Sequence, residues 1–423
     1  MKSAGSFRVW LPVGLLWVIA LLNYLDRLMI TTVREPLLAE IPMSDAQFGL
    51  LTSAFLWIYG IFSPLGGYLA DRFSRRLVII TSLLIWSAVT WLTGQMHSFE
   101  SLLAARALMG LSEACYIPAA LALIADFHPG PTRSLATGLH MSGVYVGAAL
   151  GGVGGYAAEH FGWRAGFQWF GLFGVGYAVF SIFLLRDADS RSDKTAGAAG
   201  ISGGIRAGEA LRVLFRRPAF LMLLAVNALV GVANWAVYGW LPTFLREHFR
   251  LNLGAAGLTA TGYVQMASFA GVLLGGIWAD RWSRTRPQAR AFVPAIGFCV
   301  AAPCLFFGIS TDVLPAAIAG LIVFGLGRGF FDANHMPVLR YIADQRYSAT
   351  GYGFLNFISC TTGGLLIFVG GWLKDAQVDL VHVFQFSAGS LLVAGLLLFA
   401  LKPRTGSPRG GAEVTAPARP GRD

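Results

Sequence analysis

Long apolar segments alternate with short polar ones along almost the whole chain. A helix that crosses a lipid bilayer needs about 20 mostly apolar residues, and twelve segments meet this requirement. Their approximate bounds are 10–31, 47–70, 77–96, 99–126, 134–158, 164–185, 219–245, 256–279, 290–310, 313–341, 350–373 and 380–401. The pattern predicts an all-α polytopic membrane protein with twelve transmembrane helices.

Two polar stretches interrupt this alternation. The segment 186–218, rich in Arg, Ser, Gly and Ala, follows the sixth predicted helix, and we interpret it as a cytoplasmic linker. It divides the chain into an N-terminal six-helix bundle, 1–185, and a C-terminal six-helix bundle, 219–401. The segment 402–423 is rich in Pro, Gly and Arg, and this composition predicts a disordered cytoplasmic tail.

Composition agrees with a membrane protein and excludes several other classes. Only 13% of the residues are charged, whereas a soluble domain has about 25%. The net charge of +10 does not indicate a nucleic-acid partner, because the basic residues lie in short loops between apolar segments. We expect no metal, no cofactor and no disulfide framework, since the cysteines all lie in apolar segments without ligand-type spacing: Cys115, Cys299, Cys304 and Cys360.

The distribution of Lys and Arg predicts the orientation in the membrane. If both termini are cytoplasmic, the loops on the opposite side hold five of the 32 basic residues: Arg34, Arg164, Arg246, Arg250 and Lys374. The cytoplasmic side holds 24, and cytoplasmic loops of membrane proteins carry such an excess. We therefore expect cytoplasmic termini and a location in the plasma membrane, which in a bacterium is the inner membrane.

A sequence repeat relates the two halves. Residues 66–75 read GGYLADRFSR and residues 275–284 read GGIWADRWSR, each after the second predicted helix of its half. A second match, at an offset of 219 residues, pairs Glu113 with Asp332. Two parallel six-helix repeats are typical of alternating-access transporters, whose binding site lies between the halves near the bilayer midplane.

The repeated loop resembles the signature of the major facilitator superfamily, with Ser74 where glycine is usual. The resemblance extends over essentially the whole chain and implies that fold. In this loop Arg75 can reach Asp126 at the end of the fourth helix and form a latch on one side of the transport cycle. The alternative is that these charges only set topology. The candidate gating residues in both halves are Asp71, Arg72, Arg75, Asp126, Asp280, Arg281, Arg284 and Asp344.

Four charged residues lie inside two predicted membrane helices, Asp26 and Arg27 in the first and Arg106 and Glu113 in the fourth. A charge at the centre of such a helix costs roughly 2.5–3.5 kcal/mol when it faces lipid. Arg106 and Glu113 are two turns apart on one helix face, and Tyr116 continues that face. We expect an interior cluster whose arginines bind an anion and whose acids take up protons. Permanent ion pairs that hold the helices together are the alternative.

Two local sequences resemble the anion:cation symporter family. Residues 23–27 read NYLDR, and residues 106–114 read RALMGLSEA with Pro118 following. The resemblance implies that Arg27 and Arg106 bind a substrate carboxylate. It also implies that Asp26 and Glu113 are protonation sites.

The same two stretches resemble the spinster-type lysolipid transporters. The segment 238–245, YGWLPTFL, is similar to that of organic-anion members and favours the first family. On the tenth predicted helix, Asp332 is a further candidate for proton coupling, with a local pair to Arg328 as the alternative.

Other polar and aromatic residues on the predicted helices are candidate substrate contacts, although such residues also form hydrogen bonds between helices. They are Asn23, Tyr24, Tyr116, Tyr145, Asn234, Trp235, Tyr238, Asn334, His335 and Asn356, with His140, Asn227 and Gln265 as weaker candidates.

The sequence thus predicts a proton-coupled symporter of a small organic anion, such as a sugar acid, and a monomer. Export of lysolipid, proton-driven drug efflux and sensing without transport are the alternatives. An enzyme is not expected, because no phosphate-binding loop, metal cluster or nucleophile arrangement is found in the sequence.

Overall fold

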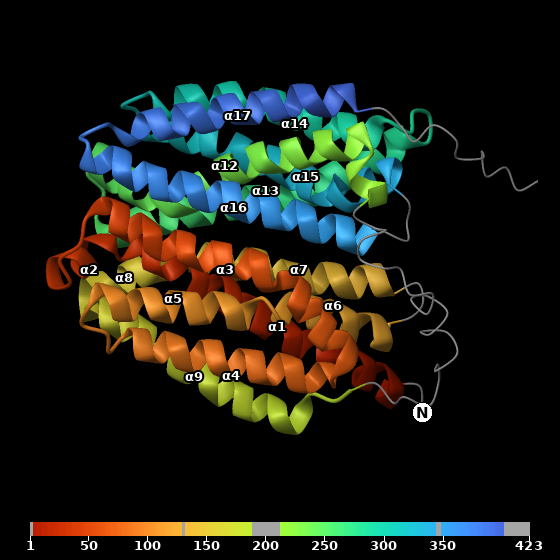
Figure 1. Cartoon of the computed structure of the whole chain (residues 1–423), viewed down its shortest axis with the longest axis horizontal. Coiled ribbons are helices and arrows are strands. Elements are labelled where there is room, and N and C mark those ends of the chain that lie inside the picture. The colour runs from red at the N-terminus through yellow and green to blue at the C-terminus, as the bar shows by residue number, and fades with distance from the viewer. Residues whose placement is uncertain (1–2, 129–131, 188–211, 344–347, 402–423) are drawn as a thin grey trace, which may run out of the picture.

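The structure is a computed structural model that describes residues 3–128, 132–187, 212–343 and 348–401. Within these ranges the regular structure is helical (Figure 1). The helices of the first half are α1 (Ser3–Thr32), α2 (Arg34–Glu40), α3 (Asp45–Arg72), α4 (Arg75–Thr93), α5 (Phe99–Glu113), α6 (Tyr116–Phe127), α7 (Arg133–Leu150), α8 (Val153–Phe161) and α9 (Trp163–Leu184). Those of the second half are α12 (Pro218–Phe249), α13 (Leu253–Ser283), α14 (Ala289–Ile309), α15 (Leu314–Ile342), α16 (Ser348–Asp375) and α17 (Leu380–Ala400).

The predicted membrane helices are present. Eleven segments in the described part of the chain are long and apolar enough to cross a membrane, and α7 with α8 covers the remaining predicted one, 134–158. The break between α7 and α8 falls at Gly151 and Gly152, where the backbone approaches α13. A Cβ atom on Gly152 would lie 2.5 Å from the carbonyl oxygen of Gly257. The two halves can therefore come this close only with glycine at this position.

The predicted helix 99–126 is also divided, into α5 and α6. Pro118 has no N–H to donate to the carbonyl of Ala114, so the regular hydrogen-bond pattern is lost there. That carbonyl lies against Gly66 of α3, whose Cβ would approach it to 2.4 Å. The break lies at Ala114 and Cys115, where the backbone of α3 comes close.

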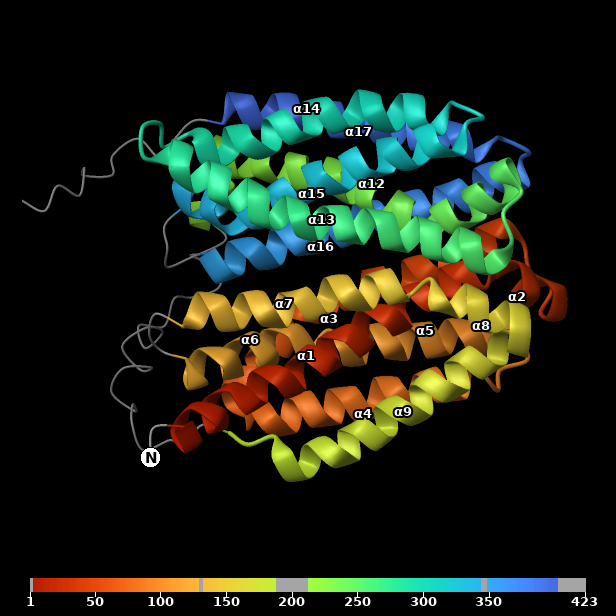
Figure 2. The same cartoon turned by 180° about the vertical axis from the view of Figure 1, so that it is seen from behind.

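The halves pack side by side, with α1 to α9 on one side and α12 to α17 on the other (Figures 1 and 2). At the boundary α3 packs on α16 and α7 packs on α13. Both the start of α1 and the end of α17 lie at one end of the molecule, which we call the terminal end. The opposite end, which carries α2 and α8, we call the closed end.

The closed end is held together by hydrogen bonds between the halves. The backbone N–H groups of Asp45 and Ala46 donate to Asp375 at 2.8 and 2.9 Å. The N–H of Gly254 donates to Glu159 at 3.0 Å. For the described residues, the hydrogen bonds and ion pairs between the halves extend from this end to the level of Tyr145 and Asp332. In the described part of the chain, the polar contacts between the halves are therefore concentrated toward the closed end.

Candidate functional site

The N-terminal charge cluster is built around one ion pair between α1 and α5. Arg27 donates from Nη2 and Nε to Glu113 Oε2, at 2.8 and 3.3 Å. Its Nη2 also donates to Asn23 Oδ1, one turn earlier, at 3.3 Å. Arg27 is 3% exposed and Glu113 fully buried, so the pair has little contact with water. The expectation that these charges face the protein interior is confirmed.

Aromatic rings enclose the Arg27 guanidinium. The rings of Tyr24, Phe55 and Tyr59 have their centroids 4.5, 4.9 and 4.5 Å from its central carbon. Phe55 also lies 4.6 Å from the guanidinium of Arg106. The negative face of a ring attracts a cation, so these rings hold both arginines in place. Sequence analysis did not identify Phe55 and Tyr59, because an aromatic residue in an apolar helix gives no signal of its own.

The other two members of the cluster are less completely paired. Asp26 accepts a hydrogen bond from Thr90 Oγ1 at 3.3 Å. Arg106 donates from Nη1 to the Met109 sulfur at 3.3 Å. Among the described residues, four of the cluster's buried polar atoms have no hydrogen-bond partner: Asp26 Oδ1, Glu113 Oε1, Arg106 Nε and Arg106 Nη2. A buried charged group without full pairing is costly, so these atoms are placed where a proton or an anion would stabilise them.

Tyr116 lies beyond the helix break, and its role as a substrate contact stays a prediction. The helix break places Tyr116 in α6, fully buried, with its hydroxyl donating to the Leu16 carbonyl at 2.8 Å. Its ring packs on Trp86 and on His140. Tyr116 therefore joins α6 to α1 instead of facing the space between the halves.

A second charge cluster lies in the C-terminal half, on α12, α13 and α15. Arg328 donates from Nη1 to Tyr238 Oη at 2.5 Å, and Gln265 Nε2 donates to the same oxygen at 2.8 Å. The Tyr238 ring centroid is 5.0 Å from the guanidinium. Asp332 lies one turn along α15, with its Oδ2 3.5 Å from Arg328 Nε, and accepts a hydrogen bond from Tyr145 of α7 at 3.1 Å. The local pair expected from the sequence is present, and it extends across the boundary between the halves.

Asn334, another candidate substrate contact, is buried and directed at α13. Its Nδ2 donates to the Phe330 and Gly275 carbonyls at 2.9 and 3.4 Å, so it is directed at α13. Its neighbour His335 stacks on the ring of Phe331 and lies against Tyr352 of α16.

The remaining candidates line the α12–α16 contact. Trp235 packs on Gly363 and lies beside Tyr238. Asn356 accepts a hydrogen bond from the Cys360 thiol at 3.9 Å, and Asn234 is half-buried. The roles of these three residues stay predictions.

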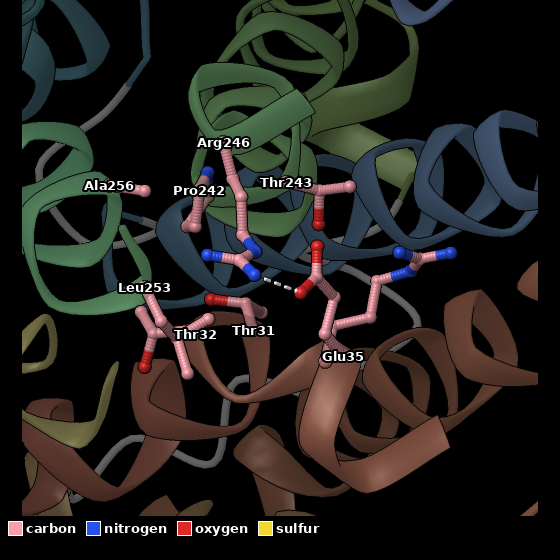
Figure 3. A pocket seen from close by; sticks show the side chains of 9 residues that line it. Thr31, Thr32, Glu35, Pro242, Thr243, Arg246, Leu253 and Ala256 are labelled. Carbon is pink, nitrogen blue, oxygen red and sulfur yellow. Dashed lines mark ion pairs between the residues drawn. The ribbon is translucent and has the colours of Figure 1, made fainter. Parts of the chain in front are cut away.

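Ion pairs that the sequence did not reveal join the halves at the closed end. Figure 3 shows a small pocket between α1, α12 and α13, beside which Arg246 pairs with Glu35 of α2 at 2.5 Å. Arg34 pairs with Asp45 and, at 3.3 Å, with Glu247 of α12. The members of the two pairs that join the halves, Arg246–Glu35 and Arg34–Glu247, are about 210 residues apart in the sequence, so only the folded chain brings them together.

The predicted gating residues lie at the terminal end. Arg75 pairs with Asp126, as the spacing predicts. In the second half Asp280 pairs at 2.7 Å with Arg290, near the start of α14. Asp344 lies outside the described residues, as does the side chain of Asp71. Arg72 donates to Tyr68 at 3.1 Å, and Arg281 and Arg284 lie at the end of α13.

A sequence profile of the Major Facilitator Superfamily matches residues 16–367. The "probable sulfoacetate transporter" of Cupriavidus necator is 26% identical over 92% of this chain and 93% of its own length. The hexuronate transporter of Bacillus subtilis is 26% identical over 95% of this chain and 96% of its own. Among solved structures, an inward-facing bacterial homologue of the human lysosomal transporter spinster matches with a TM-score of 0.74 and 22% identity, over 95% of this chain and 96% of that one.

Proposed function

Because the chain belongs to the major facilitator superfamily, we propose that it moves a small organic anion together with protons by alternating access. The chain is an integral membrane protein of a transporter family, not an enzyme. The relatives named for hexuronate and sulfoacetate support an anionic substrate. The observation that carries the proposal is the buried N-terminal cluster of two arginines and two acids, in which Arg106, Asp26 and Glu113 have polar atoms without hydrogen-bond partners among the described residues.

The anion would bind to the two arginines of this cluster. Arg106 has Nε and Nη2 free of hydrogen-bond partners among the described residues, and a guanidinium binds a carboxylate or sulfonate through two parallel N–H groups. Arg27 becomes available when a proton neutralises Glu113, its carboxylate partner at 2.8 Å. Proton uptake would therefore precede or accompany binding of the anion, which couples the two.

Asp26 would be the second protonation site. It lies beside Arg27 on α1, fully buried, with only the Thr90 hydroxyl as a hydrogen-bond partner among the described residues. A buried carboxylate with so little pairing is stabilised when it takes up a proton. On this proposal both acids change between the charged and the neutral form, Arg27 changes its partner from Glu113 to the anion, and Arg106 binds the anion directly.

The two ends of the molecule would open in turn. When the closed end opens, the pairs Arg246–Glu35 and Arg34–Glu247 must break, because each joins one half to the other. We assign the terminal end to the cytoplasm, on the excess of Lys and Arg there, and the protein to the plasma membrane. The segment 1–185 would move as one bundle relative to 219–401, as a monomer.

Uptake into proteoliposomes tests this function. The purified chain should accumulate labelled sulfoacetate or glucuronate only with an inwardly directed proton gradient, and Arg27→Ala and Arg106→Ala should each reduce uptake at least 100-fold. Arg133→Ala, exposed at the start of α7, serves as the control and should transport as wild type does. If no anion moves while lysophosphatidylcholine does, a spinster-like lipid transporter replaces this proposal.

A further inference from the structure

Arg328 is held in a fixed position in the middle of a membrane helix. It is the fifteenth of the 29 residues of α15, so it lies near the midplane if α15 spans the bilayer. Tyr238 of α12 accepts its hydrogen bond at 2.5 Å and also receives one from Gln265 of α13. Tyr238 is 6% exposed and Gln265 1%. Three helices therefore orient this guanidinium, which is more than an i, i+4 pair on a helix surface requires.

The bond between Arg328 and its carboxylate is weak by comparison. The ion pair is formed by Nε and Asp332 Oδ2 at 3.5 Å, beyond the usual range for a charge-assisted hydrogen bond. Among the described residues, Nη2 donates to no acceptor. A third of the Asp332 side chain is exposed, against 12% for Arg328. Nε and Nη2 form the edge of a guanidinium that binds an oxyanion through two bonds, and here a loosely held carboxylate lies at that edge.

This arrangement is not a copy of the N-terminal one. The offset of 219 residues that places Glu113 on Asp332 places Met109 on Arg328 and Gly325 on Arg106. The C-terminal arginine therefore occurs at a position where the first half has no charge. Its carboxylate comes from the same helix, whereas the acid of the first half receives two hydrogen bonds from an arginine on another helix.

We propose that Arg328, Tyr238 and Gln265 form a second oxyanion-binding site, in which an acidic group of the transported substrate displaces Asp332 from Arg328. The proposal rests on the proposed function, since it assigns part of the same substrate to the C-terminal half. Asp332, which the sequence indicated as a proton-coupling residue, is on this proposal a replaceable counterion.

The hydrogen bond from Tyr145 would keep the Asp332 carboxylate in position after the substrate displaces it from Arg328. Tyr145 lies on α7 of the other half and donates to Asp332 at 3.1 Å. When the anion takes the guanidinium, Asp332 keeps this partner across the boundary. Binding at Arg328 would thus leave a contact between the halves intact. On this proposal a second acidic group of the substrate has its own partner at Arg328, so dianions should bind more tightly than monoanions.

Equilibrium binding to the purified full-length chain tests the proposal, with sulfoacetate as the dianionic probe and glucuronate as the monoanionic one. Arg328→Gln should raise the Kd of sulfoacetate at least tenfold, and Tyr238→Phe several-fold. Asp332→Asn should leave the Kd unchanged or lower it, because it removes the competing carboxylate. Arg340→Gln, exposed three turns further along α15, is the matched control and should bind as wild type does.

The outcomes separate this site from the function on which it rests. If wild type binds sulfoacetate and both Arg328→Gln and Tyr238→Phe stay within twofold of it, the second site is absent while anion transport stands. If Asp332→Asn weakens binding as much as Arg328→Gln, Asp332 stabilises the site and is not displaced from it. If wild type binds neither probe, both proposals fail. Should Arg328→Gln not yield folded protein, Tyr238→Phe alone decides.

Discussion

The two intramembrane clusters contain the same chemical groups but hold them differently. In the N-terminal half Arg27 makes two hydrogen bonds to a fully buried Glu113 and is enclosed by three aromatic rings. In the C-terminal half the contact between Arg328 and Asp332 is longer, at 3.5 Å, and a third of the Asp332 side chain is exposed. A tightly held, desolvated pair is suited to a switch operated by a proton. A loose, partly solvated pair is suited to exchange one anion for another.

Stability measurements should show this difference most strongly. Arg27→Gln leaves the buried Glu113 carboxylate without its cation, and breaking a buried pair in this way costs about 3–5 kcal/mol. Arg328→Gln should cost only about 1 kcal/mol, because partly exposed pairs contribute little. Chemical unfolding in mixed micelles at pH 7 measures both. The double variant Arg27→Gln with Glu113→Gln should recover most of the loss, and equal losses for Arg27→Gln and Arg328→Gln would contradict the comparison.

A second prediction concerns the closed end, which keeps both clusters from solvent on that side. Gly152→Ala places a methyl group 2.5 Å from the Gly257 carbonyl, so the halves must separate there. The distance between spin labels at the exposed positions Gln95 and Val313, one in each half, should lengthen and broaden. Gly138→Ala, in open space on α7, is the control. An unchanged distance would show that the halves tolerate the methyl group without opening.

The smallest predicted effect concerns α2. Arg164 and Trp163 donate to Glu40 at 2.8 and 2.6 Å, and the hydrogen bond from Arg164 is the main cause that lowers the pKa of this carboxyl below its ordinary value. A lowered pKa means that the contribution to stability is present above the ordinary carboxylate pKa and is lost as the pH falls through the lowered one.

Glu40→Gln should therefore shift the melting temperature slightly at pH 7 and not at all at strongly acidic pH. Thermal unfolding of the wild type and the variant across this range measures the shift. A larger shift at acidic pH than at pH 7 would reverse the predicted sign. The contact joins α2 to α9 of the same half, so its loss should leave the C-terminal cluster unaffected.

Much of the fold followed from the sequence, because hydropathy and the 66–75 repeat are local signals. The spacing of Arg106 and Glu113 was also sufficient to predict an interior charge cluster. The hydrogen bond from Tyr116 to Leu16 was not predictable from helical spacing, because the two residues lie 100 positions apart in the sequence. The contact of Asn334 with α13 was not predictable for a related reason: helical position does not reveal which neighbouring helix a side chain faces.

Contacts between residues far apart in the sequence could not be predicted from helical periodicity, which relates only near neighbours along the chain. Glu247 lies 213 residues from Arg34, and Tyr59 reaches Arg27 only because α3 packs beside the cluster. The contacts of Arg328 were only partly predictable for the same reason. Its i, i+4 neighbour Asp332 can be identified from the spacing, but its contacts with Tyr238 and Gln265 on other helices cannot.

The most direct test of the account compares accumulation with exchange for Glu113→Gln. In the same proteoliposomes, uptake driven by a proton gradient and exchange of labelled for unlabelled sulfoacetate would be measured for wild type, Glu113→Gln and Asp332→Asn. The account predicts that Glu113→Gln loses gradient-driven accumulation at least tenfold while it keeps exchange, and that Asp332→Asn keeps both. Loss of both activities in Glu113→Gln, or accumulation equal to wild type, would contradict a proton switch in the N-terminal half.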